Sequence, residues 1–223
     1  MEKEKHVLVI FPHPDDESFG ISGTIAMYTK NNVPLTYVCC TLGEMGRNMG
    51  NPPFATRESL PEIRKKELEK ACEALNINDL RLLGLRDKTL EFEDLDDLAN
   101  YFSPIIDELK PSLIITFYPG YSVHPDHDAC GAAVIHAVER LPKAERPTVH
   151  CVAFSNNCVD ELGPPHITRD VSAYAEDKLV AIQAHASQFG AFVRGRAAKH
   201  GLEDKQVRER INTEYFWVYK WSD

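Results

Sequence analysis

The sequence lacks the features of nucleic-acid-binding and membrane proteins. It has no excess of positive charge, because 25 lysine and arginine residues stand against 34 aspartate and glutamate residues, a formal net charge of -9. Nucleic-acid binding depends on clustered cationic side chains, so no nucleic-acid partner is expected. No apolar run is long enough to span a membrane, and no apolar signal segment opens the chain. We therefore expect a cytoplasmic protein without a membrane partner.

Cysteine pairs with metal-binding spacing are also missing. None of the six cysteines forms a C-x-x-C pair, and Cys39 and Cys40 are adjacent within an apolar run. We expect reduced, mostly buried thiols rather than a thiolate metal site. Linker-like tracts, internal repeats and low-complexity segments are absent, and 43% of the residues are hydrophobic. These features predict a single domain over residues 1–223 with a sizeable core.

The apolar pattern predicts strands that alternate with helices. Short continuous apolar runs are typical of strands buried on both faces, and amphipathic stretches are typical of surface helices. Such an alternation implies parallel βαβ units, an α/β protein with a three-layer Rossmann-like fold and a mostly parallel sheet. The predicted strands are 6–11, 35–42, 80–85, 113–118, 149–154 and 214–221, and the predicted helices are 18–31, 60–75, 95–109, 130–141 and 173–187.

Two polar motifs follow the first and fourth predicted strands. The first is Pro12-His13-Pro14-Asp15-Asp16-Glu17, and the second is His124-Pro125-Asp126-His127-Asp128. Each contains a proline, which restricts the local backbone and favours a fixed turn. In an open α/β sheet, ligands bind beyond the carboxyl ends of the strands. The two motifs are therefore expected to converge in space.

The residue types in these motifs predict a catalytic metal site. His13 and Asp16 are three residues apart, so one turn can aim both at the same point. His127 can complete a set of three protein ligands that leaves a fourth position open, as catalytic zinc requires. Two histidines and one carboxylate also suit Fe2+, so both Zn2+ and Fe2+ stay open. The competing interpretations are a structural metal site or two polar turns.

The remaining residues of the motifs predict catalysis at that site. Asp15 is free to act as a general base on a water molecule acidified by the metal. His124, oriented by Asp126, is predicted to stabilise an oxyanion or to protonate a leaving amine. A dinucleotide-binding turn is excluded after the first strand, because G-x-G-x-x-G is missing and carboxylates occupy the place of the phosphates. The long polar connection at residues 43–61 is predicted to cover the substrate.

At these residues the sequence resembles the LmbE/PIG-L family of zinc-dependent N-acetyl-sugar deacetylases. Both motifs match the signatures of the family, and the likeness extends over most of the chain through residues 41–44, 63–68, 83–87 and 178–188. The resemblance implies that His13, Asp16 and His127 are the metal ligands. It further implies a homo-oligomer and an N-acetyl amino-sugar substrate.

The same resemblance assigns roles to the other motif residues. It implies that Asp15 is the general base, that His124 and Asp126 are a charge-stabilising pair, and that Arg64 contacts the substrate. Some family members place a catalytic tyrosine shortly before the second motif, and Tyr121 lies three residues before His124. Tyr121 is therefore a candidate substrate contact, beside its interpretation as an ordinary loop residue.

Within the family, residues 43–52 and 117–123 resemble the deacetylases of bacillithiol biosynthesis. This likeness implies N-acetylglucosaminyl malate as the substrate. Because the malate group carries two negative charges, a cationic partner is expected, and the candidates are Arg47, Arg57 and Arg64. For Arg47 and Arg57 a solvated loop residue is the favoured interpretation, and only Arg64 is supported by the family resemblance.

Three functions stay open at this point. The first is hydrolysis of the N-acetyl group of the malate glycoside. The second is the same chemistry on another substrate, as a thiol-conjugate amidase or a deacetylase of another N-acetyl sugar. The third is a metal-binding protein without turnover, which would leave Asp15 and His124 without a task.

Overall fold

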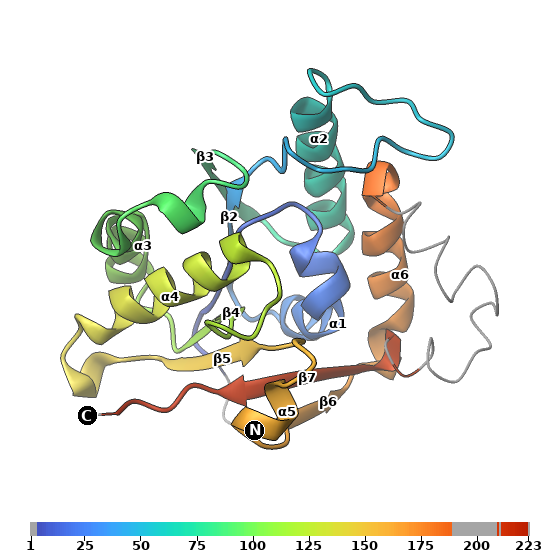
Figure 1. Cartoon of the computed structure of the whole chain (residues 1–223). Coiled ribbons are helices and arrows are strands. Elements are labelled where there is room, and N and C mark those ends of the chain that lie inside the picture. Colours follow the sequence, from blue (N-terminus) through green and yellow to red (C-terminus); the bar gives the residue numbers. More distant parts are fainter. Residues whose placement is uncertain (1–3, 189–208, 210, 223) are drawn as a thin grey trace.

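The computed structural model describes residues 4–188, 209 and 211–222, and over these residues seven strands form one sheet. The strand order is β3-β2-β1-β4-β5-β7-β6 (Figure 1). The strands β1 to β5 are parallel, whereas β7 is antiparallel to both β5 and β6. The strands are β1 (Val7–Phe11), β2 (Leu35–Thr41), β3 (Asp79–Leu85), β4 (Leu113–Phe117), β5 (Thr148–Val152), β6 (Ile167–Asp170) and β7 (Thr213–Val218).

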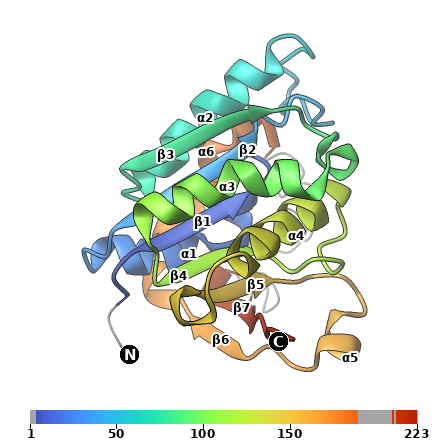
Figure 2. The same ribbon diagram turned by 90° about the vertical axis from the view of Figure 1, so that its left-hand side faces the viewer.

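Helices cover both faces of this sheet, which confirms the predicted three-layer α/β fold. On one face α1 and α2 pack with α6, and on the other face α3 packs with α4 (Figures 1 and 2). Alternate residues of β1 point to opposite faces, so Val9 joins the first core and Ile10 the second. The helices are α1 (Asp16–Lys30), α2 (Leu60–Ala74), α3 (Leu95–Leu109), α4 (Pro125–Glu139), α5 (Cys158–Leu162) and α6 (Ala175–Ala184).

Both polar motifs lead directly into helices that begin earlier than predicted. We predicted helices from residues 18 and 130, but α1 begins at Asp16 and α4 at Pro125. In α4 the ring of His124 accepts a hydrogen bond from the N–H of Asp126, as an N-cap side chain does, and Pro125 takes the first helical position. Histidine is not among the usual capping residues, so the sequence pattern did not reveal this start.

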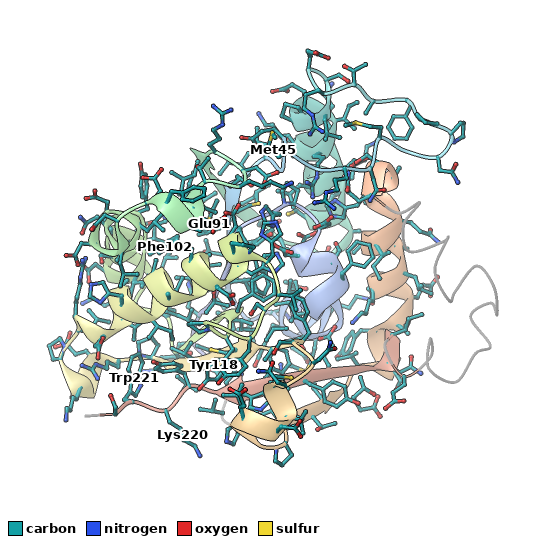
Figure 3. All side chains as sticks on the ribbon, viewed as in Figure 1. Met45, Glu91, Phe102, Tyr118, Lys220 and Trp221 are labelled. Atoms are coloured by element: carbon teal, nitrogen blue, oxygen red, sulfur yellow. The ribbon has the colours of Figure 1, made fainter. Side chains whose placement is uncertain are left out.

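The carboxy-terminal third of the chain differs most from the prediction. The elements α5 and β6 were not predicted, and the last strand ends at Val218 and runs antiparallel. The predicted helix 173–187 is a short 3-10 turn followed by α6, which ends where His185 leaves the helical conformation. Beyond β7, Trp221 packs against Tyr219 and lies 4.9 Å from the guanidinium of Arg146 (Figure 3).

Two expectations from composition meet the structure directly. All six cysteines are buried, as predicted, and none forms a disulfide. Within the described part of the chain, no helix combines the length and the apolar composition that a membrane crossing requires.

The order of the strands creates a crevice between β1 and β4. The chain leaves β1 toward α1 on one face, and it leaves β4 toward α4 on the opposite face. Since β1 and β4 are neighbours, the two connections diverge and open a gap beyond their carboxyl ends. Both motifs line this point of the sheet.

A buried ion pair ties α6 to β7 and α1. Lys178 Nζ lies 2.6 Å from Glu214 Oε1, and each side chain is at most 2% exposed. The Glu214 carboxylate also accepts hydrogen bonds from the N–H groups of Gly23 and Thr24 in α1, at 3.0 and 2.8 Å. One carboxylate therefore joins three elements.

We expect Lys178→Met to lower the free energy of unfolding by about 3–5 kcal/mol, because it leaves a buried carboxylate without its cation. Urea denaturation measures this loss. The control is Lys30→Met, since Lys30 pairs with Asp177 at 2.7 Å across the same α1–α6 contact but its side chain is 45% exposed. Its loss should stay below about 1 kcal/mol. Similar losses for the two variants would contradict the role of the buried pair.

Candidate active site

The first motif turns the chain from β1 into α1 within a few residues. The N–H of His13 donates to Asp16 Oδ2 at 2.9 Å, and the N–H of Asp15 donates to Glu17 Oε2 at 3.0 Å. Asp15 adopts a φ of 104°, a conformation that non-glycine residues rarely take. This turn aims the side chains of His13, Asp15 and Asp16 into one cavity.

The second motif brings His127 to the same cavity. Its ring stacks on Phe117 at the end of β4, with centroids 4.1 Å apart, and its Nδ1 donates to the carbonyl of Ser122 at 3.1 Å. Gly131 lets α4 approach this strand end, because a Cβ there would lie 2.4 Å from the carbonyl oxygen of Phe117. The position of His127 is therefore fixed by close backbone packing.

The three residues predicted as metal ligands lie together. His13 Nδ1 is 3.2 Å from His127 Nε2 and 3.5 Å from Asp16 Oδ2, and His127 Nε2 is 3.3 Å from Asp16 Oδ1. Tetrahedral zinc with ligands at about 2.0–2.1 Å places neighbouring ligand atoms about 3.3–3.4 Å apart. The separation of the two nitrogens is close to this spacing, and Asp16 approaches them with two different oxygens.

The hydrogen bonds around the two rings leave lone pairs facing this point. His127 uses Nδ1–H on Ser122, so its neutral form has a bare Nε2. His13 Nε2 lies 3.1 Å from Asp87 Oδ1 and 3.2 Å from Asp126 Oδ2, so Nε2 carries the proton in the neutral ring, and Nδ1 is then bare. Two bare nitrogens and a carboxylate converge there, an arrangement that needs a cation.

The charges around His13 also favour a bound cation. Burial opposes the charged form of His13, but the carboxylates of Asp126, Asp16 and Asp87 outweigh it and raise its pKa well above the ordinary value. Burial likewise opposes ionisation of Asp16, and His127 with His13 holds its pKa far below the usual range. A divalent cation would supply the positive charge that this cluster requires.

Two groups of side chains in the described residues have spacings that suit a metal ion. They are His13 with His124 and His127, and His13 with Asp87 and Asp126. In the second group both carboxylates lie at hydrogen-bond distance from His13 Nε2. Such carboxylates fix the tautomer of a ligating histidine and increase its basicity. We therefore expect the metal on the Nδ1 side of His13.

Asp126 and His124 are linked differently from the prediction. The buried Asp126 carboxylate accepts hydrogen bonds from His13 and from the N–H groups of Lys88 and Leu90, at 2.7 and 3.2 Å. Only the main-chain N–H of Asp126 reaches His124, where it donates to Nδ1 at 3.2 Å. This bond places the proton of neutral His124 on Nε2. Asp126 therefore orients His124 through its backbone and His13 through its side chain.

Arg64 holds the turn that contains Asp15. Its guanidinium donates to the carbonyl of Gly43 at 2.8 Å, to the carbonyl of Pro14 and to Asp15 Oδ2 at 3.0 Å. Gly43 has a φ of 61°, and a Cβ there would lie 1.8 Å from Arg64 Nη1, so glycine is required. Burial raises the pKa of Asp15 to about 6, and the charge of Arg64 opposes that rise. Arg64 lines the cavity, but three of its hydrogen bonds are made inside the protein.

The other predicted substrate contacts separate in the structure. Arg47 is exposed and lines the cavity, on the loop that leaves β2. Arg57 instead donates to the carbonyls of Glu44 and Gly46, at 2.6 and 2.9 Å, and braces that loop. Tyr121 donates its hydroxyl to Glu161 at 2.8 Å and packs against Tyr118, apart from the residues that line the cavity.

The cavity has a volume of about 410 Å³ and includes residues that were not predicted as site residues. Asp87 and Lys88 follow β3, and Met45 lies on the loop after β2; all three line the cavity, and Figure 3 labels Met45. Burial opposes ionisation of Asp87, but the bond from His13 outweighs it and lowers its pKa. The signal available in the sequence was their place at the carboxyl end of a third parallel strand. The loop predicted to cover the substrate thus contributes its first residues to the cavity wall.

The end of α6 supports the floor of the site. His185 Nε2 lies 2.7 Å from Glu17 Oε1, and both side chains are fully buried. Ser187 donates its N–H and its hydroxyl to the carboxylate of Glu67 in α2, at 2.7 and 2.6 Å. These bonds hold α6 against the first motif.

Comparison with known proteins agrees with this geometry. The family model described as "PIG-L: GlcNAc-PI de-N-acetylase" matches residues 8–138. The "Probable N-acetyl-alpha-D-glucosaminyl L-malate deacetylase 2" of Bacillus anthracis is 55% identical over 225 residues, covering 100% of this chain and 99% of the relative. The protein of the same name from Bacillus cereus is 52% identical over 219 residues, covering 98% and 100%.

A solved structure supports the fold. The N,N'-diacetylchitobiose deacetylase from Pyrococcus horikoshii superposes with a TM-score of 0.73 over 98% of this chain and 85% of its own. Its sequence identity is 23%, so the likeness speaks for the fold alone.

We expect Asp87→Asn to weaken binding of a divalent metal by about 10- to 100-fold, because a neutral amide supports the basicity of His13 less than a carboxylate does. Competition with a chromogenic chelator on metal-stripped protein measures the affinity. The control is Asp96→Asn, which removes an exposed carboxylate on α3 and should leave the affinity unchanged. Wild-type affinity in Asp87→Asn would show that Asp87 does not tune the site.

Proposed function

The chain belongs to the PIG-L family, and from this membership we propose that it is a metal-dependent deacetylase acting on N-acetylglucosaminyl malate. The observation that carries the proposal is the convergence of Asp15 with three metal-binding side chains at one cavity. The similarity of this chain, over nearly its whole length, to relatives named for this substrate supports the choice of substrate. The reaction consumes water and yields glucosaminyl malate and acetate.

His13, Asp16 and His127 would hold the metal, as Zn2+ or Fe2+. The ion would supply Lewis-acid polarisation of the amide carbonyl and of the attacking water. Two nitrogens and one carboxylate suit both metals, so the donor set supports either ion.

Asp15 accepts the proton of the attacking water. Its carboxylate lies beside Asp16, and Arg64 and the Glu17 carboxylate fix its side chain and its backbone. Because the turn is held from both sides, the base needs little reorganisation before it takes the proton. The same carboxyl group can then return a proton to the products.

His124 carries a proton toward the cavity. Since its Nδ1 accepts the N–H of Asp126, the neutral ring presents Nε2–H. That donor can stabilise the negative charge that develops on the carbonyl oxygen, or it can protonate the leaving amine. The single domain, the cytoplasmic location and the homo-oligomer inferred from the sequence stay predictions.

We expect Asp15→Asn to lower kcat by about 100- to 10,000-fold, since the amide cannot accept the proton. The variant should keep its metal, because Asp15 is not among the proposed ligands. Acetate release and metal content by plasma emission spectrometry give the two readouts. Wild-type turnover in this variant would overturn the mechanism, and loss of the metal would move Asp15 into the ligand set.

The substrate is tested with metal-stripped protein reconstituted with Zn2+ or with Fe2+. We expect acetate release only after metal is added, and a higher kcat/KM for N-acetylglucosaminyl malate than for N-acetylglucosamine. Comparable values for the two sugars would reject the malate-specific assignment. Bound metal without release of acetate from either sugar would favour a metal-binding protein.

A further inference from the structure

A malate group brings two negative charges to a cavity with an acidic floor. The carboxylates of Asp15, Asp16 and Asp87 line the cavity, and the whole chain has a formal net charge of -9. Repulsion from these groups disfavours a dianionic substrate unless cations lie near its carboxylates. Selectivity for such a substrate therefore requires cationic side chains on the wall of this cavity.

The cationic side chains in and near the cavity differ in the hydrogen bonds that they make within the protein. Arg64 binds the carbonyls of Gly43 and Pro14 and the carboxylate of Asp15, and Arg57 binds two carbonyls of its own loop. Besides Arg64, the arginine and lysine side chains that line the cavity are Arg47 and Lys88. Among the described residues, neither side chain has a hydrogen-bond or ion-pair partner. Both charges are therefore available to a ligand.

Arg47 and Lys88 project from two loops that hold each other. The loop after β2 and the loop after β3 exchange two hydrogen bonds: Met45 N–H donates to Asp87 Oδ2 at 2.8 Å, and Asp87 N–H donates to Glu44 Oε1 at 2.9 Å. Arg47 and Lys88 therefore extend from two loops that are hydrogen-bonded to each other at the edge of one cavity.

The backbone of Lys88 is further fixed to the metal-site network. Its N–H donates to the buried Asp126 carboxylate at 2.7 Å, and its φ of 63° directs the chain sharply at this point. The same carboxylate orients His13, so the position of the Lys88 backbone is fixed relative to the proposed metal site. A fixed origin reduces the entropy lost when the ammonium group binds an anion.

We propose that Arg47 and Lys88 are specificity-determining residues that bind the two carboxylates of the malate group. This proposal rests on the proposed function and names the residues that select a dianionic aglycone. Arg47 can bind one carboxylate through two parallel N–H bonds, and Lys88 binds the other as a compact charge. The sugar then lies between them and the floor, with its acetamido group toward Asp15 and His124.

The test compares N-acetylglucosaminyl malate with the neutral methyl glycoside of N-acetylglucosamine. In Arg47→Gln and in Lys88→Gln, kcat/KM for the malate glycoside should fall by roughly 10- to 100-fold, mainly through KM. For the neutral glycoside the fall should stay below about 3-fold, because no charge contact is lost. The double variant should lose most of the preference for the malate glycoside. Added salt should raise the wild-type KM for the malate glycoside more than that of the double variant.

Arg86→Gln is the matched control. Arg86 is exposed two residues before Lys88 and is absent from the cavity wall, so its removal lowers the net charge of the same loop without touching the site. We expect the substrate preference of this variant to equal that of the wild type. A fall like that of Lys88→Gln would mean that general charge, not a contact, sets the preference, and this result would overturn the proposal.

Two further outcomes separate the proposal from the proposed function. A wild-type enzyme that does not prefer the malate glycoside would reject both. A wild-type enzyme with that preference, together with a double variant that keeps it or loses activity equally on both glycosides, would overturn the roles of Arg47 and Lys88 alone.

Discussion

The whole site depends on the contacts that the buried ring of His13 makes through its two nitrogens. On its Nδ1 side the ring faces Asp16 and His127, and on its Nε2 side it meets Asp87 and Asp126. Three carboxylates around one buried imidazole are unfavourable unless positive charge is present. The charge of a bound ion would therefore stabilise both the site and the packing of the loops that form it. Because these five residues come from the exits of β1, β3 and β4, one ring links three strands of the sheet.

The conformation of Asp15 is the strained part of this arrangement. A positive φ at a non-glycine residue costs about 1–3 kcal/mol, which the surroundings must offset. Glu17 accepts the N–H of Asp15, and its carboxylate is in turn held by Tyr37 and by the buried His185. Arg64 grips the turn from the α2 side. The layers behind the sheet thus hold the proposed base in place before any substrate binds.

Local sequence patterns predicted most elements of the fold. The helix Leu95–Leu109 was predicted with the observed bounds, and the central strands were predicted to within about two residues. The starts of α1 and α4 were missed because the motif residues cap and begin these helices with histidine, aspartate and proline, without an apolar stripe. The strand β6 was missed because it is short and pairs with the antiparallel strand β7, and α5 was missed because it has only five residues. Partners that lie far apart in the chain leave no local pattern.

The sequence by itself determined that both motifs follow parallel strands, and it supplied the proposed chemistry: the side chains that can bind a metal and the carboxylate that remains as a candidate base. These conclusions follow from residue type and local spacing. Only the tertiary structure decided how the polar groups are paired. In the structure the Asp126 carboxylate is hydrogen-bonded to His13, and Arg64 and Arg57 donate to backbone carbonyls. Tyr121 donates to Glu161, and Lys88 and Arg47 line the same cavity. The reason is physical: a charged side chain is defined by the partners within a few ångströms of it, and here those partners come from other strands and loops.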